Sequence, residues 1–199
     1  MILPNTANIV ITASNFNPSI ITKDWLYQNS ILVEPLTNFI NTPVFSNSET
    51  NEFQMIVAQD RLQLTLKQVT QANIKAALDK LTKIVDLLPH TPYKAIGYNF
   101  GYRFSKDECN IEFLFSPNRE HIAKLMSKEY ELGANILFPF DGFIVTFSVS
   151  PIAREKRDRE LRFNYHSSIS SSDEIRARLN KQQEIFEKTT SVVEALCHK

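Results

Sequence analysis

The chain has 199 residues, of which 43% are hydrophobic and 22% charged, and this ordinary globular composition excludes an intrinsically disordered protein. Its 22 basic and 22 acidic residues balance, so no global charge favours nucleic acid or an acidic membrane as the partner. The length predicts a single domain over residues 1–199. Only 4 glycines are present, which leaves little room for phosphate-cradling loops and excludes most nucleotide-binding fingerprints.

The beginning of the chain lacks the basic segment, apolar run and small-residue cleavage site of a signal peptide. No apolar run approaches the ~20 residues that span a bilayer. Cys109 and Cys197 are far apart in the sequence, and we expect both to be reduced thiols, because disulfides are rare in the cytosol. These features together predict a cytoplasmic protein that does not enter the membrane.

In the first half of the chain, the β-branched residues 8–15 predict a strand. Residues 16–52 predict a long connection with little regular structure, apart from a short helix near Lys23–Ile31. Alternation of apolar and polar residues then predicts a hairpin over residues 53–67 that is wet on one side. Apolar residues at three- and four-residue steps predict an amphipathic helix over residues 70–88.

The next strand, predicted over residues 93–105, has two unlike faces. One face is a continuous aromatic and aliphatic row, which is more typical of a core than of a stacking surface. The opposite face carries Gly97, Asn99, Gly101 and Arg103, and small residues there let another backbone or helix approach closely.

The second half predicts a partner strand over residues 110–116, followed by a helix over residues 117–133 that begins at a favoured Ser-Pro start and ends at glycine. The Asp-Gly dipeptide predicts a tight turn in a hairpin over residues 134–150. A strand over residues 161–166 then leads into the longest predicted helix, residues 172–197.

Hairpin links favour an antiparallel sheet, so the predicted fold class is α+β. We expect a largely antiparallel sheet of about eight strands in hairpins, with helices packed on one face and a long C-terminal helix. Residues 52–105 and 109–197 each place strands before a helix, which suggests a weak internal duplication.

Two stretches of the sequence resemble a sporadically distributed, uncharacterised bacterial protein family. They are residues 60–65 (DRLQLT), with the helix and the strand 95–103 (AIGYNFGYR) that follow, and the terminal strand with its long helix. Family members carry a Gly-Leu-Arg-Tyr-Ile-Asn-Arg-like strand, where this chain has Gly97-Tyr98-Asn99-Phe100, and they are longer. The resemblance covers about half of the chain and implies no activity, since the family has none assigned. Its patchy distribution is associated with mobile or defence-related bacterial loci.

No catalytic or metal-binding motif is present. His166-Ser167-Ser168 matches a His-x-Ser element, but acid–base chemistry of that type needs two such elements facing each other. Cys109 has no activating base nearby in the sequence, and no Gly-x-Ser-x-Gly elbow exists. We therefore expect no cofactor and favour a protein that is not an enzyme, although dispersed residues such as Arg103, Asp141 and His166 could still assemble a site. None of the four histidines stands at metal-ligand spacing: His90, His121, His166 and His198.

The segment 154–162 holds five cations and three anions, and mixed-sign runs of this kind are more typical of a solvated surface than of a binding site. If it contacts phosphates, Tyr98, Tyr102 or Tyr165 could stack bases on an open sheet face. A small-ligand- or nucleic-acid-binding module, using this segment or a cavity under the C-terminal helix, is the alternative function. Its candidate binding residues are Arg103, Arg154, Lys156, Arg157, Arg159 and Arg162.

The apolar seam of the C-terminal helix either packs on the sheet of its own chain or, in part, pairs with a second copy. A well-patterned domain without a catalytic constellation favours a non-catalytic interaction or scaffold protein. The expected partner is another protein or a second copy of the chain.

Overall fold

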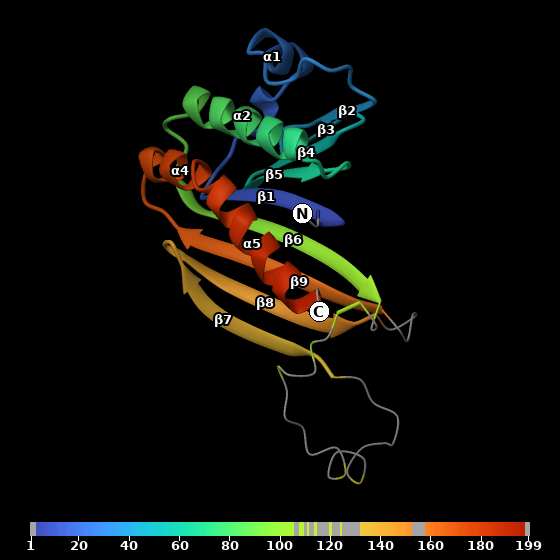
Figure 1. Cartoon of the computed structure of the whole chain (residues 1–199). Helices are drawn as coiled ribbons and strands as arrows, with labels where there is room; N and C mark the ends of the chain where they lie inside the picture. The colour runs from blue at the N-terminus through green and yellow to red at the C-terminus, as the bar shows by residue number, and fades with distance from the viewer. Residues whose placement is uncertain are drawn as a thin grey trace.

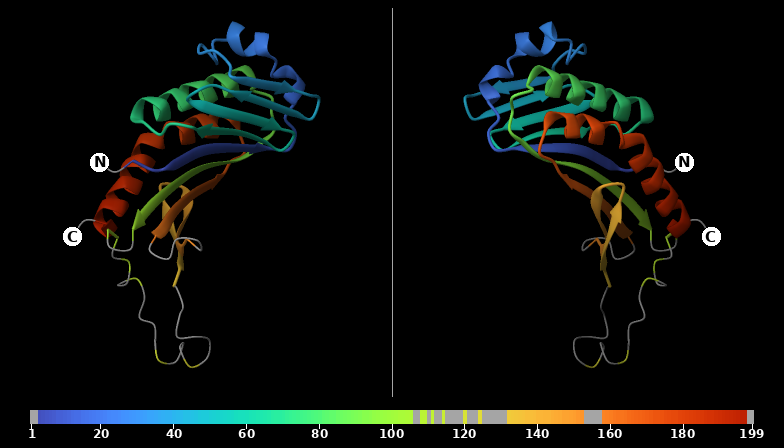
Figure 2. Two further views of the ribbon diagram at one scale, coloured as in Figure 1. Left: turned by 90° about the vertical axis from the view of Figure 1, so that its right-hand side faces the viewer. Right: turned by 90° about the vertical axis from the view of Figure 1, so that its left-hand side faces the viewer.

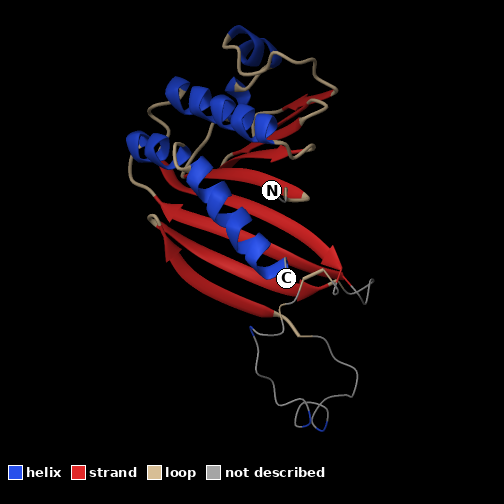
Figure 3. Ribbon diagram, viewed as in Figure 1, coloured by secondary structure: helices blue, strands red, loops and turns tan. Residues whose placement is uncertain are grey.

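A computed structural model gives the structure of the protein and describes residues 3–105, 108, 109, 111, 114, 120, 124, 132–152 and 158–197. The described residues form a mixed α+β fold with a nine-stranded antiparallel sheet (Figures 1 and 3). The strands are β1 Thr6–Ala13, β2 Asn38–Asn41, β3 Phe45–Glu49, β4 Phe53–Ala58, β5 Arg61–Leu66, β6 Tyr93–Ser105, β7 Ala134–Phe140, β8 Phe143–Pro151 and β9 Asp158–Ser168. The helices are η1 Pro18–Ile20, α1 Lys23–Gln28, α2 Gln71–Leu87, α4 Ser172–Leu179 and α5 Gln182–Cys197. The strand predicted over residues 110–116 and the helix predicted over 117–133 lie almost wholly outside the described residues.

The sheet is built as two units that meet at a central pair of strands. The strand order is β2-β3-β4-β5-β1-β6-β9-β8-β7, so β1 and β6 lie side by side in the middle. Each of these two strands is the first strand of a unit and pairs with the last strand of that unit. Each unit then ends in helical structure, α2 after β5 and α4 with α5 after β9. We call β1 to α2 the N-terminal unit and β6 to α5 the C-terminal unit. The two units therefore begin at β1 and β6. The weak duplication of residues 52–105 and 109–197 stays a prediction.

The predicted connection over residues 16–52 is wrong in part, because it contains β2 and β3 as well as η1 and α1. This addition brings the sheet to nine strands instead of about eight. After Phe45 the residues of β3 are polar, yet Ser46, Asn47 and Ser48 are buried. The Ser46 hydroxyl donates to the Ile21 carbonyl at 3.2 Å, and the Asn41 amide donates to the same carbonyl at 2.9 Å. Such bonds hold strands that no apolar alternation marks in the sequence.

The predicted long C-terminal helix is also corrected, because it is two helices separated at Asn180 and Lys181. The Lys181 amide donates to the Arg178 carbonyl at 3.1 Å, a step of three residues that interrupts the regular helical ladder. The Tyr98 hydroxyl of β6 donates to the same Arg178 carbonyl at 3.1 Å and satisfies an acceptor that the break exposes. A contact from a distant strand therefore stabilises the break.

Helices α2, α4 and α5 lie across one side of the sheet, whereas α1 lies beyond its β2 end (Figure 1). The expectation that all helices pack on one face is therefore only partly met. The seam of α5 is buried against its own sheet, with Phe186 ring-to-ring at 6.0 Å from Phe100. Thr189, a polar residue that interrupts this apolar seam, is also buried within the chain, because its hydroxyl is 2.7 Å from the Tyr165 hydroxyl.

Candidate functional site

The face of the C-terminal unit that points away from α4 and α5 is polar and uncovered. Figure 2 shows α5 on one side of these strands and no described helix on the other. Along β6, Asn99 and Arg103 point to the uncovered face, whereas Tyr98 and Tyr102 are 0% and 1% exposed in the core. The predicted aromatic core face of this strand is confirmed. Stacking of bases on Tyr98, Tyr102 or Tyr165 is wrong, because all three rings are buried.

A row of asparagine side chains crosses the middle of this face. Asn8, Asn99 and Asn164 stand opposite one another on β1, β6 and β9. The Asn99 amide donates to the Asn8 oxygen at 2.8 Å, and the Asn164 amide donates to the Asn99 oxygen. Because each amide donates in the same direction, the row leaves an amide group at Asn8 and an amide oxygen at Asn164 for further hydrogen bonds.

The asparagine row lies in a hollow of about 500 Å³, lined by residues of β1, β6, β7, β8 and β9. Gly101 forms part of its floor, and a side chain there would collide with the Thr6 hydroxyl. Thr146 and Ser148 of β8 add hydroxyl groups to the lining. The hollow therefore presents neutral hydrogen-bonding groups beside the Glu160–Arg162 ion pair, and such groups suit the recognition of polar groups on a partner.

Two of the predicted basic residues stand on this face, and both form ion pairs. Arg103 contacts Asp158 through two nitrogens, at 2.8 and 2.7 Å. Arg162 contacts Glu160 at 2.7 Å, with 65% of its side chain exposed. Arg159 is on the opposite face and only 7% exposed, so it is not part of a basic surface. Arg154, Lys156 and Arg157 lie outside the described residues.

At the outer end of the same face, three apolar side chains gather on β7 and β8. Leu137 is 67% exposed and Ile144 54%, and Pro139 is also exposed. Pro139 stands directly opposite Ile144, and Leu137 is a diagonal neighbour of Ile144. We call Leu137, Pro139 and Ile144 the β7–β8 apolar group. Sequence reasoning missed it, although an isoleucine on the otherwise polar side of the second strand was a signal.

The dispersed catalytic residues considered from the sequence are not brought together. Arg103 pairs in register with Glu160, and His166 pairs with Gly97, so six residues of strand separate them, about 20 Å. Asp141 lies in the β7–β8 turn, where its carboxylate contacts Lys181 at 3.1 Å. No group of three metal-ligating side chains occurs in the described part of the chain.

A groove of about 460 Å³ lies between α2 and the junction of α4 with α5, so it is beside the C-terminal helices and not the expected cavity between α5 and the sheet. Ile74, Leu78, Leu179 and Phe186 form its apolar lining, and Asp79 and Gln183 add polar groups. The groove is separate from the hollow, because the two have no lining residue in common.

Among the described helices, none combines the length and apolarity needed to cross a membrane. In comparisons with family profiles and with curated proteins, the sequence matches no family and no curated protein. The resemblance to the bacterial family therefore stays a prediction.

Proposed function

We propose that the protein is a non-catalytic interaction protein that pairs with a second copy of itself through the uncovered face of β7 and β8. The β7–β8 apolar group carries this proposal. Large apolar side chains exposed at 67% and 54% stand next to a hollow of hydrogen-bonding groups. An apolar centre beside a polar rim is the usual anatomy of a protein–protein interface.

The charge and the strand geometry favour a second copy as the occupant. The formal net charge is zero, so two copies approach without global repulsion. A patch on one side of the molecule can contact itself around a two-fold axis and close the assembly as a dimer. Pro139 has no backbone N–H and sits in the outermost strand, which opposes open-ended strand addition.

The chemistry of the hollow supports binding rather than catalysis. The central groups are the amides of Asn8, Asn99 and Asn164, which do not gain or lose protons near neutral pH. They hydrogen-bond to one another and are thereby oriented before a partner arrives. The same proposal includes a cytoplasmic location and a bacterial origin for the protein, which are predictions from the sequence and from the family resemblance.

Sedimentation velocity on the purified protein tests the proposal, with the double variant Leu137→Lys, Ile144→Lys. We expect the wild type to sediment as a dimer and the variant to weaken the association at least about tenfold, because it places charges in the apolar contact. The matched control is Ile40→Lys, Val44→Lys, which changes exposed apolar residues at the opposite end of the sheet. The control is expected to leave the dimer intact.

A wild type that stays monomeric at high micromolar concentration contradicts the proposal. Native mass spectrometry of the same sample then separates the remaining functions. The ligand-binding alternative would be favoured by a monomer that carries a small molecule. That molecule should be lost in the variant Leu78→Arg, which changes the groove between α2 and the junction of α4 with α5.

A further inference from the structure

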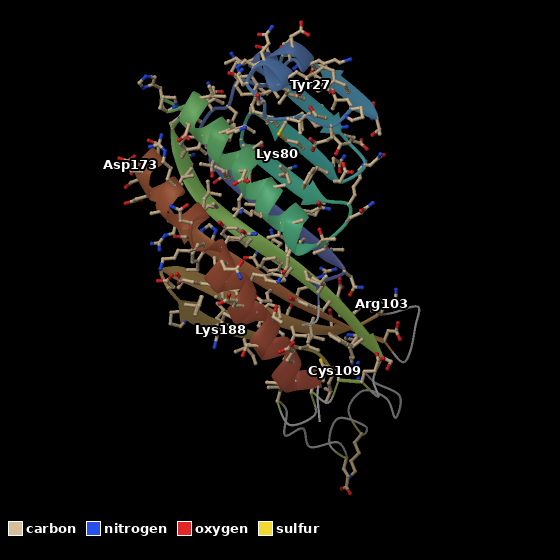
Figure 4. The ribbon with its side chains drawn as sticks, turned by 45° about the horizontal axis from the view of Figure 1, so that its top comes forward. Tyr27, Lys80, Arg103, Cys109, Asp173 and Lys188 are labelled. Carbon is tan, nitrogen blue, oxygen red and sulfur yellow. The ribbon has the colours of Figure 1, made fainter. Side chains whose placement is uncertain are left out.

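The two cysteines of the chain meet at the end of α5. Beyond β6, the Ser105 amide donates to the Glu108 carboxylate at 2.9 Å and the Glu108 amide donates to the Ser105 carbonyl at 3.1 Å. Cys109 follows Glu108 and lies at the last turn of α5, where Figure 4 labels it. Cys197 is the last residue of that helix. Residues that are far apart in the sequence are therefore neighbours.

The Cys109 thiol contacts the last turn of α5 directly, next to Cys197. The Cys109 sulfur lies 3.9 Å from the carbonyl oxygen of Leu196, the residue before Cys197. The proximity of the two thiols lowers the pKa of Cys109, whereas the same proximity together with burial raises the pKa of Cys197. Cys109 is 2% exposed, whereas Cys197 is half-buried and reachable from solvent. Both sulfurs are free thiols in this structure.

We propose that Cys109 and Cys197 are a reversible oxidation site that hydrogen peroxide converts to an intramolecular disulfide. One thiol loses its proton, and the thiolate attacks a peroxide oxygen, so that the S–O bond forms as the O–O bond breaks. The leaving hydroxide takes up the lost proton, and the products are a sulfenic acid and one water. The second thiol attacks the sulfenic sulfur, forms the S–S bond and releases a second water. The two thiols together lose two protons and two electrons, and these reduce one peroxide to two waters.

The disulfide joins the last turn of α5 to the exit of β6. It closes the chain from residue 109 to residue 197, which encloses all of β7, β8, β9 and α4. Closing a loop of this length restricts the unfolded chain and therefore stabilises the fold. The site lies on the α5 side of the sheet and does not depend on pairing through the β7–β8 apolar group.

The test uses the reduced, full-length wild type, treated with a small excess of hydrogen peroxide and analysed by intact mass and thiol titration. We expect the monomer mass to fall by about 2 Da and both thiols to disappear together. The melting temperature should rise by about 5–10 °C and return to its starting value with dithiothreitol. Peptide mapping should recover Cys109 linked to Cys197.

Cys197→Ser is the matched variant, since residue 197 is only half-buried and a serine fits there. Under the same treatment it should gain oxygen at Cys109 or form a covalent dimer, without the 2 Da loss in a monomer. The proposal is overturned if the wild type instead gains oxygen on each sulfur, or if its only disulfide joins two chains. The wild-type measurement decides the matter even if the variant folds poorly.

Discussion

In both units of the sheet the first strand pairs with the last strand, but the outer edges of the two units differ. In the N-terminal unit, β3 is held by the buried Ser46 hydroxyl, and α1 with its following loop lies against α2. In the C-terminal unit, the outer strand β7 and its neighbour β8 present Leu137 and Ile144 to solvent. The N-terminal unit is thus held near its edge by polar contacts within the chain, although Ile40 and Val44 are exposed there. In the C-terminal unit, Leu137 and Ile144 instead stand beside the polar hollow.

The units also share a device at the ends of their helices. The Tyr93 hydroxyl donates to the Leu88 carbonyl at the end of α2, at 3.0 Å. The Tyr98 hydroxyl donates to the Arg178 carbonyl near the end of α4, at 3.1 Å. Both tyrosines belong to β6, so the central strand fixes the helix end of each unit and couples the two. The comparison therefore predicts that the two units differ at their edges but unfold together, because they share one core.

The largest expected effect tests that single core. Phe163 of β9 is 1% exposed, and Phe163→Ala should lower the free energy of unfolding by about 3–5 kcal/mol. Because the only tryptophan, Trp25, lies in the N-terminal unit, its fluorescence reports on the other side of the central pair. We expect urea unfolding followed by Trp25 fluorescence to shift as much as unfolding followed by circular dichroism.

The matched variant is Leu64→Ala on β5. This strand is the last of the N-terminal unit, as β9 is the last of the C-terminal unit. It should shift both signals by a similar amount, about 3 kcal/mol. Two separate transitions in either variant would break the comparison, because the units would then unfold independently.

The next effect concerns the contact that closes the N-terminal edge. The Lys80 ammonium of α2 lies 2.9 Å from Glu34 and donates to the Ile31 carbonyl at 3.0 Å, and Lys80 is only 8% exposed. Lys80→Ala should cost about 2–4 kcal/mol, because it removes the counter-charge of a partly buried carboxylate and the side-chain donor to the Ile31 carbonyl. Lys83→Ala, which removes an exposed bond to the Ser30 carbonyl, should cost less than about 1 kcal/mol.

The same contact has a pH signature. Burial alone would raise the pKa of Glu34, but hydrogen bonds from Lys80 and from nearby backbone amides outweigh it and lower the pKa below 4.5. The stabilisation is therefore present above the unfolded pKa and is lost as pH falls through the lower folded value. Urea midpoints of wild type and Glu34→Gln should differ at pH 7 and converge at low pH. A constant difference would contradict this assignment.

A smaller effect compares the two tyrosines that cap the helices. Tyr98→Phe should cost about 1–2 kcal/mol, since it removes a buried hydrogen bond to the Arg178 carbonyl in the core. Tyr93→Phe should cost about 1 kcal/mol or less, because Tyr93 is 6% rather than 0% exposed and water can replace its bond. Thermal or urea denaturation of the two variants gives the order, and the reverse order would contradict it.

Alkaline pH sharpens this pair. Burial raises the pKa of Tyr93 to about 12 and also raises that of Tyr98. The stabilisation is complete below the unfolded tyrosine pKa near 10, and it decreases above pH ~10 by about 1.4 kcal/mol per pH unit for each protected tyrosine. Tyr98→Phe should make the loss of stability between pH 10 and 12 less steep.

The smallest effect is expected at the ion pairs of the uncovered face. Arg162, with 65% of its side chain exposed, should tolerate replacement by alanine at a cost below about 0.5 kcal/mol. A low cost would mean that Arg162 and Glu160 can separate and contact a partner without loss of the fold. A cost above about 1 kcal/mol, measured by urea denaturation at moderate salt, would mean that this face is structural.

The strongly patterned elements were predictable from the sequence because their signals are local. The hairpin over residues 134–150 followed from an Asp-Gly turn, and both turn residues have the positive φ that such a turn needs, 46° and 78°. The helix over residues 70–88 followed from apolar residues spaced to form one stripe. The candidate site was not predictable to the same degree, since Arg103 and Arg162 were expected but the asparagine row and the β7–β8 apolar group were not.

By itself, therefore, the sequence determined the fold class, the hairpins, the helix α2 and the buried face of β6. Only the tertiary structure decided the two-unit strand order, the strands β2 and β3, the break between α4 and α5, and the meeting of Cys109 with Cys197. The physical reason is range. Hydrophobic periodicity and turn preferences act between residues a few positions apart, whereas these features depend on hydrogen bonds and contacts between residues tens of positions apart.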